Sequence, residues 1–171
     1  LAAEEVSSIM ARLAIPTDKP LITQVSRFDR LKDPLGVIAA FKMIQPYVTA
    51  RLLRVGGCAD DDPEGSQVLA EGRAAAEGDP DILVLCLPPT SNLEINAIQR
   101  ASEIIIQKSL KEGFGLTVSE ALWKGKPVIA GAVGGIPLQI THKYSGILTR
   151  TIEGTAYWMK RLLHEPAFAR R

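Results

Sequence analysis

The sequence predicts an open α/β fold with a parallel sheet of six strands and helices on both faces. Short apolar runs alternate with helix-like segments along the whole chain of 171 residues. The run "DILVLCL" (81–87) is continuously apolar, which is typical of a strand buried on both faces of a parallel sheet. Because strands and helices alternate, a parallel sheet covered by helices is the best arrangement, and the length fits one domain over residues 1–171.

The first third of the chain supplies a helix, a strand and a second helix. The opening stretch "LAAEEVSSIMARLAI" (1–15) has a helical pattern, and "PLITQVS" (20–26) is typical of a strand. The segment "PLGVIAAFKMIQ" (34–45) predicts a helix, because Asp33 is a good N-cap and Pro34 suits the first helical position.

The middle third repeats the pattern twice. We expect strands at 50–56, 81–87 and 103–109, since each is a short run rich in apolar residues. Helices are expected at 62–77, which begins with another Asp-Pro pair, and at 92–101.

The last third completes the alternation. A helix is expected at 116–125, where Gly125 closes it, and a strand at 126–131. A short helical turn at 135–142, a final strand at 145–150 and a helix at 153–164 follow. Six strands in this arrangement predict a Rossmann-like sheet.

Composition excludes several classes of partner. The net charge is +1, from 20 basic and 19 acidic residues, which gives no reason to expect nucleic acid or an acidic membrane surface. No apolar run approaches the roughly 20 residues that cross a bilayer, and no signal peptide opens the chain, so we expect a cytoplasmic protein. Cys58 and Cys86 form no CxxC motif and are predicted to be buried, reduced thiols.

Ligands of such a sheet bind beyond the carboxyl ends of its strands, so the loops there are the candidates for function. In the first of them, "SRFDRLKDP", Arg27 ends a strand and Lys32 follows five residues later. An arginine fork and a lysine ammonium at one edge suit a diphosphate. The alternative is that both are solvated surface charges, which is the usual fate of these residues.

The loop "SLKEGFG" combines glycines with carboxylates. Gly113 and Gly115 allow a close approach of the backbone to a ligand and dihedral angles that other residues avoid. A helix that begins near Leu116 directs its free N–H groups at the same place, which favours an anion. Glu112 is placed to hold sugar hydroxyls and Glu120 to hold a ribose diol; alternatively they are a capping acid and an exposed helix residue.

Other motifs carry less chemistry. In the run 60–62, Asp62 precedes Pro63 and is expected to cap a helix rather than bind a metal, while His142 and His164 are too isolated for a metal site or a catalytic triad. The chain has no G-x-G-x-x-G, no P-loop and no G-x-S-x-G motif.

The tryptophans are expected to be packing residues. Trp123 and Trp158 each lie within a predicted helix, and we expect both to pack those helices rather than to stack on a sugar.

The segments "SRFDRLK" and "EGFGLTVSEALWKGKPVIAGAVGGIPLQI" resemble the C-terminal nucleotide-sugar domain of retaining GT-B glycosyltransferases of family 4. Glu112 and Glu120 match the family's Glu-x7-Glu signature, and Arg27 and Lys32 match its diphosphate clamp. The resemblance covers nearly the whole chain. The segments "GGCADDDPEGSQVLAEG", "LPPTSNLEINAIQRAS" and "QKSLKEGFGLTVSEALWKGKPVI" look most like the branch that forms trehalose, which also includes trehalose phosphorylases.

The sequence departs from the family at two positions. Asp33 follows the clamp lysine, where the family often has glycine, and this change could alter the geometry of the loop. Leu138 follows the proline of "GGIP", where many members have glutamate.

The resemblance implies transfer of glucose from a nucleotide diphosphate glucose with retained configuration. Arg27 and Lys32 would stabilise the charge on the leaving diphosphate, and Glu112 would orient the glucose. The implied donor-binding residues are Gly113, Phe114, Gly115, Leu116, Thr117, Glu120 and Asn96. A retaining glycosidase, which also uses two carboxylates, fits less well because the Arg–Lys pair favours a phosphate.

The resemblance also implies what the chain lacks. No metal or other cofactor is expected, because two cations and a helix N-terminus can neutralise the diphosphate. The sugar acceptor would bind mainly to an N-terminal domain that this sequence does not contain, so we expect a piece of a longer protein that binds the donor sugar nucleotide. Two alternatives stay open: a trehalose phosphorylase that uses glucose 1-phosphate, and a non-catalytic nucleotide-binding module.

Overall fold

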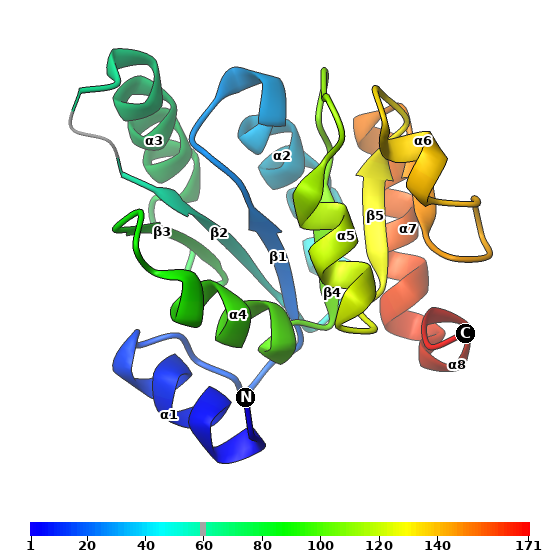
Figure 1. Cartoon of the computed structure of the whole chain (residues 1–171), viewed down its shortest axis with the longest axis horizontal. Coiled ribbons are helices and arrows are strands. Elements are labelled where there is room, and N and C mark those ends of the chain that lie inside the picture. The colour runs from blue at the N-terminus through cyan, green and yellow to red at the C-terminus, as the bar shows by residue number, and fades with distance from the viewer. Residues whose placement is uncertain (59–60) are drawn as a thin grey trace.

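Six parallel strands form a single sheet in the computed structural model, which describes residues 1–58 and 61–171. The strand order is β3-β2-β1-β4-β5-β6 (Figure 1). The strands are β1 (Leu21–Val25), β2 (Arg51–Gly57), β3 (Ile82–Leu87), β4 (Ile104–Gln107), β5 (Val128–Gly131) and β6 (Ile147–Thr149). The predicted six-stranded, Rossmann-like parallel sheet is therefore confirmed.

Helices cover both faces of the sheet. Figure 1 shows α4 and α5 in front of the strands, with α1 below α4, whereas α2, α3 and α7 cover the other face. The α-helices are α1 (Ala3–Arg12), α2 (Pro34–Ile44), α3 (Pro63–Ala76), α4 (Asn92–Ala101), α5 (Leu116–Trp123), α6 (Ile136–Gln139), α7 (Ile152–His164) and α8 (Pro166–Ala169). Two 3₁₀ helices that the sequence did not predict are η1 (Arg30–Lys32) and η2 (Gln45–Tyr47).

The predicted helix signals act as expected. The side chain of Asp33 accepts a hydrogen bond from the N–H of Gly36, and that of Asp62 accepts one from Gly65, so each caps the helix that follows. Gly125 ends α5 with a φ of +68°, a conformation that side chains disfavour.

The strand order changes direction at β1: β2 and β3 are added on one side of it, and β4, β5 and β6 on the other. This strand pairs with β2 on one side and with β4 on the other, so Ile22 faces both Leu52 and Ile104. These three side chains are fully buried and belong to the core between the sheet, α2 and α7. The loops that follow β1 and β4 therefore leave neighbouring strands at the switch point, where ligands of open α/β sheets bind.

The predicted state of the cysteines is wrong. Cys58 is exposed, Cys86 is half-buried, and the two form a disulfide with their Cα atoms 5.6 Å apart. The pairing of β2 with β3 runs as far as Gly57 and Leu87, which brings Cys58 beside Cys86 across a sequence separation of 28 residues. That separation hid their proximity in the sequence.

The two tryptophans differ in how far their side chains are buried. Trp158 is buried and stacks on Phe168, as predicted for a packing residue. The prediction for Trp123 is wrong, because its side chain is 88% exposed. Trp123 is the last residue of α5, and this helix buries Val118 and Ala121 instead.

Candidate functional site

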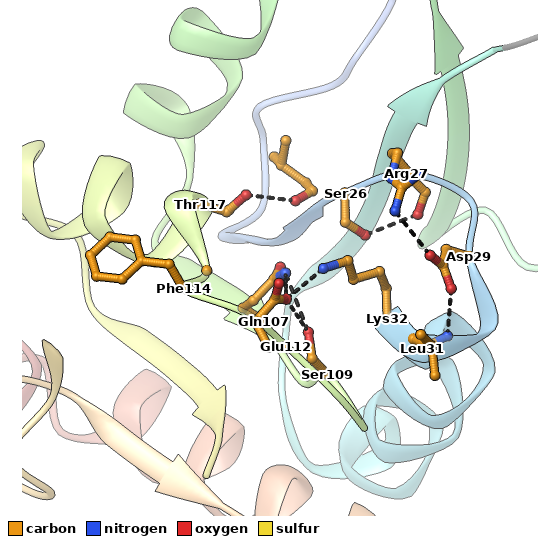
Figure 2. A network of polar contacts seen from close by, with 12 residues as sticks. Ser26, Arg27, Asp29, Leu31, Lys32, Gln107, Ser109, Glu112, Phe114 and Thr117 are labelled. Atoms are coloured by element: carbon orange, nitrogen blue, oxygen red, sulfur yellow. Dashed lines mark hydrogen bonds and ion pairs between the residues drawn. The ribbon is translucent and has the colours of Figure 1, made fainter. Parts of the chain in front are cut away.

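The loops after β1 and β4 meet through an ion pair. Lys32 lies in the loop of residues 26–33, which we name the clamp loop, and its Nζ is 2.5 Å from Oε2 of Glu112 in the loop after β4. The two side chains are only 15% and 11% exposed. Figure 2 shows both pointing into the space between the loops. The structure thus brings together the predicted clamp lysine and the predicted sugar-binding carboxylate.

Glu112 accepts two further hydrogen bonds. Ser109 donates through Oγ at 2.9 Å and Gln107 through Nε2 at 3.3 Å, both to the oxygen that Lys32 contacts. Burial would raise the pKa of Glu112, but the bonds from Lys32, Ser109 and Gln107 outweigh burial and hold that pKa below its ordinary value. The carboxylate is therefore ionised and held in a fixed orientation near neutral pH.

A second ion pair joins the same two loops. Nζ of Lys108, at the end of β4, contacts the Oδ2 atom of Asp33 at the end of the clamp loop, and the lysine is buried. Asp33 has a left-handed backbone, with a φ of +48°. Aspartate tolerates this conformation better than most residues do, which explains how it replaces the glycine that the resembling family often has here.

The other end of the clamp loop is more open. The side chain of Arg27 is 80% exposed, and its only ion pair in the described part of the chain is to Asp29, at 3.3 Å (Figure 2). Asp29 also accepts a bond from the N–H of Leu31 and so caps η1. Arg27 is consequently free to reorient toward a ligand.

The N-terminus of α5 points at the site. Gly115 precedes it with a φ of +82°, and a Cβ there would lie 3.0 Å from the side chain of Ile136, so glycine is strongly favoured. The hydroxyl of Thr117 donates to the carbonyl of Val25 at the end of β1, which ties α5 to the clamp side of the sheet. The first N–H groups of the helix have no partners within it and suit an anion.

The two residues that flank Gly115 have exposed side chains. The side chains of Phe114 and Leu116 are exposed, and Figure 2 shows the Phe114 ring directed away from Lys32 and Glu112. The Phe114 ring therefore lies apart from the ion pair of Lys32 and Glu112.

Gly113 does not need an unusual backbone, contrary to our expectation. Its φ lies outside the left-handed region, and a Cβ built on it meets nothing within 4 Å. A glycine that cannot be replaced without a clash lies instead in the loop after β5. A Cβ on Gly134 would be 1.8 Å from the carbonyl oxygen of Glu112. Gly135 then donates its N–H to the carbonyl of Gly113 at 2.6 Å. The pair Gly134–Gly135 thus fixes the backbone beside Glu112.

Glu120 is exposed on α5 and accepts a hydrogen bond from Nε2 of Gln99 at 3.2 Å. Gln99 is buried in α4, so it orients the carboxylate. Asn96 lies one turn earlier on α4, but its Oδ1 accepts from Nε of Arg100 on the same helix. Asn96 is therefore engaged within α4 and is not joined to the other predicted site residues.

Sequence reasoning missed the residues that orient the acidic side chains of the site. Gln107, Lys108 and Ser109 form a polar triplet directly after the apolar run "III", and all three are buried. Buried polar side chains at the end of an inner strand were the available signal, because such groups require partners. Gln99 had no comparable signal in the sequence.

No group of three or more metal-binding side chains occurs among residues 1–58 and 61–171. Of the acidic run 60–62, Asp62 caps α3, and Asp60 lies outside the described residues. Within the same described ranges, no helix is both long and apolar enough to span a membrane.

Residues 5–171 match the family described as glycosyl transferases group 1. The chain belongs to this family. It is 45% identical to the trehalose synthase of Rubrobacter xylanophilus over 99% of its own length and 41% of that protein's. It is 41% identical to the trehalose phosphorylase of Pleurotus pulmonarius over 75% of its length, which is 20% of the phosphorylase. The chain thus spans well under half of these relatives.

Solved structures share the fold. A sucrose-phosphate synthase from Thermosynechococcus elongatus is 31% identical, with a TM-score of 0.78, over 96% of this chain and 41% of that one. The C-terminal domain of the group 1 glycosyl transferase LpcC from Francisella tularensis is 25% identical, with a TM-score of 0.80, over 98% of this chain and 87% of that one. Anabaena HepE in complex with UDP-glucose has a TM-score of 0.82 at 18% identity, over 99% of this chain and 46% of that one, which shows the fold alone.

Proposed function

We propose that this chain is the donor-binding domain of a retaining glycosyltransferase that transfers glucose from a nucleotide diphosphate glucose, with glucose as acceptor to give trehalose. The observation that carries the proposal is the contact between Lys32 and Glu112 at the switch point of the sheet. In a sugar nucleotide, the sugar and the β-phosphate share one oxygen. A cation for the phosphate and a carboxylate for the sugar hydroxyls must therefore be neighbours, as these two residues are.

In the proposed reaction, the bond between the anomeric carbon and the β-phosphate oxygen breaks, and its electrons remain on that oxygen. Lys32, Arg27 and the N-terminus of α5 stabilise the charge that develops there. The acceptor oxygen bonds to the anomeric carbon from the side that the phosphate leaves, and the acceptor's proton leaves with the nucleoside diphosphate. Glu112 holds the transferred sugar and does not act as a nucleophile.

Lys32 can serve the phosphate while it stays near Glu112. An ammonium group has three N–H donors, and Glu112 uses one of them. Arg27 completes the clamp in this proposal, because its side chain is exposed and its ion pair with Asp29 lies at the surface. Glu120, oriented by Gln99, supplies an acceptor for the ribose hydroxyls.

The proposal names trehalose because two kinds of trehalose enzyme share more than 40% identity with this chain. A trehalose phosphorylase remains the second candidate, on the identity to the Pleurotus pulmonarius protein. It would use the same cations for the phosphate of glucose 1-phosphate. The acceptor sugar is proposed to bind chiefly to a further domain, since the relatives are much longer than this chain.

The test is a calorimetric titration of the chain with UDP-glucose, ADP-glucose, GDP-glucose and glucose 1-phosphate. We expect one donor to bind, and we expect Arg27→Ala and Glu120→Ala to weaken it. Arg30→Ala is the matched control, because Arg30 lies in the same loop but pairs with Glu71 of α3. Saturable binding of glucose 1-phosphate alone would favour the phosphorylase.

Absence of binding is resolved with the longest natural protein that contains this chain. If none of the four compounds binds to that protein either, the proposed function is wrong.

A further inference from the structure

Arg54 is a buried guanidinium in β2 that the proposed chemistry leaves unexplained. Its side chain is 1% exposed, and burial lowers its pKa to about 9. Its hydrogen-bond partners in the described part of the chain are carbonyl oxygens rather than carboxylates. Because a buried charge without a charged partner is costly, a hydrophobic residue would be the ordinary choice at such a strand position.

Two of the three carbonyl groups that Arg54 binds, those of Ser26 and Arg27, lie at the start of the clamp loop. Nη1 donates to Ser26 at 2.9 Å and to Val55 at 2.6 Å, and Nη2 donates to Arg27 at 2.6 Å. The guanidinium also lies over the ring of Phe28, 4.5 Å from its centroid. One side chain thus contacts three consecutive residues of the clamp loop.

These contacts add to two other hydrogen bonds at the start of the loop, from the N–H of Ser26 to Val55 and from Oγ of Ser26 to the carbonyl of Arg27. The Arg27 side chain is mostly exposed, so the position of its backbone decides which points the guanidinium can reach. A guanidinium presents several N–H groups in one rigid plane and can bind neighbouring carbonyls together, whereas a lysine ammonium is a single point on a flexible stem. The geometry is specific to arginine.

We infer that Arg54 is a positioning residue that fixes the backbone at Ser26 and Arg27 so that Arg27 reaches the diphosphate of the donor. The inference rests on the proposed function and assigns a role that neither the clamp motif nor the signature glutamates contain. Arg54 does not touch the donor; it acts through Arg27.

A double-mutant cycle tests this role. Arg54→Met and Arg54→Lys are made in the natural background and in the Arg27→Ala background, and the dissociation constant for the bound donor is measured by calorimetry. We expect each Arg54 substitution to weaken binding about tenfold in the natural background, the size of one lost charge-assisted hydrogen bond. In the Arg27→Ala background we expect a change within about twofold, because no side chain is left to position.

Arg51→Met is the matched control. Arg51 is a second buried arginine of β2, but it lies at the opposite end of the strand and pairs with Asp18 and Asp81. Its replacement should lower the melting temperature without changing the donor affinity. If Arg54→Met does not fold, Arg54→Lys and Phe28→Leu, which removes only the stacked ring, carry the same cycle.

The outcomes separate this inference from the proposed function. Equal weakening in both backgrounds would show a general structural role and overturn the inference, as would full affinity in Arg54→Lys. Both results leave the donor-binding function intact. If the unsubstituted protein binds no donor, the proposed function and this inference fail together.

Discussion

The two ends of the clamp loop differ in how firmly their charges are held. At one end, Lys32 and Asp33 form ion pairs with Glu112 and Lys108, and all four side chains are largely shielded from water. At the other end, the Arg27 side chain is exposed and, among the residues that the structure describes, forms an ion pair with Asp29 alone. The lysine is therefore preorganised for a ligand, whereas the arginine can adjust when the ligand arrives.

Because of this difference, losing an ion pair should affect the free energy of unfolding differently at the two ends. An exposed ion pair such as that of Arg27 contributes about 0 to 1 kcal/mol to stability. Removing one partner of a buried pair leaves an uncompensated charge and costs roughly 3 to 5 kcal/mol. Substitutions at the Lys32 end should thus affect both folding and function, and substitutions at the Arg27 end should affect function alone.

The largest effect is expected for Lys32→Met. It removes the preorganised cation at the charge that develops in the proposed reaction. The rate of the proposed glucose transfer, measured in the longest natural protein that contains this chain, should therefore fall by a factor of about 10² to 10³. Steady-state kinetics with the preferred donor measure this loss. Lys111→Met is the control, since Lys111 is exposed next to Glu112 and should keep activity. A Lys32→Met protein with normal turnover would contradict the assigned role.

Asp33→Asn tests the second buried pair. Asparagine keeps the left-handed backbone and the cap on Gly36 but leaves Lys108 without its carboxylate. The free energy of unfolding in urea should fall by roughly 3 kcal/mol, at the low end of the range for a buried pair because Asp33 keeps some contact with water.

Asp33→Ala separates the cap from the charge. It should cost about 2 kcal/mol more than Asp33→Asn, through loss of the cap and through the strain of alanine in a left-handed backbone. Equal stability of the natural protein and Asp33→Asn would show that the Lys108 pair does not hold the loop.

Arg27→Ala tests the mobile end. Donor affinity should fall about tenfold, while the free energy of unfolding should change by less than about 0.5 kcal/mol, because the lost ion pair is exposed. Calorimetry and urea unfolding give the two quantities. A large loss of stability would show that this end is as constrained as the other.

The smallest expected effect is the pH dependence of the stability that Glu112 contributes. The pKa of Glu112 is held below its ordinary value in the folded protein, so the carboxylate stabilises the fold above the ordinary glutamate value of about 4.3. That contribution is lost as the pH falls through the lower, folded pKa. The stability difference between the natural protein and Glu112→Gln should therefore shrink from pH 7 to pH 3 in urea unfolding. A constant difference would contradict the ionised pair.

Much of the fold follows from local sequence signals. The Asp-Pro starts at 33–34 and 62–63 and the glycine at 125 mark helix ends because each acts on its own turn. The contact between Lys32 and Glu112 could be anticipated, since the switch-point rule joins the loops after β1 and β4.

Features that depend on three-dimensional register were not predictable in this way. The disulfide of Cys58 and Cys86 arises only from the pairing of β2 with β3. The need for glycine at 134 comes from its approach to the carbonyl of Glu112, not from its own loop. The outward direction of Trp123 depends on which face of α5 meets the sheet.

The central claim is that the diphosphate of the donor binds at the pair formed by Lys32 and Glu112. The direct test is the pKa of Glu112, followed by NMR of its labelled carboxyl carbon, with and without saturating nucleoside diphosphate. The diphosphate should share the Lys32 ammonium with Glu112 and add negative charge nearby, and both effects raise the pKa of Glu112. A clear rise in the pKa of Glu112 is the predicted result. An unchanged pKa of Glu112 in the saturated protein would contradict the account.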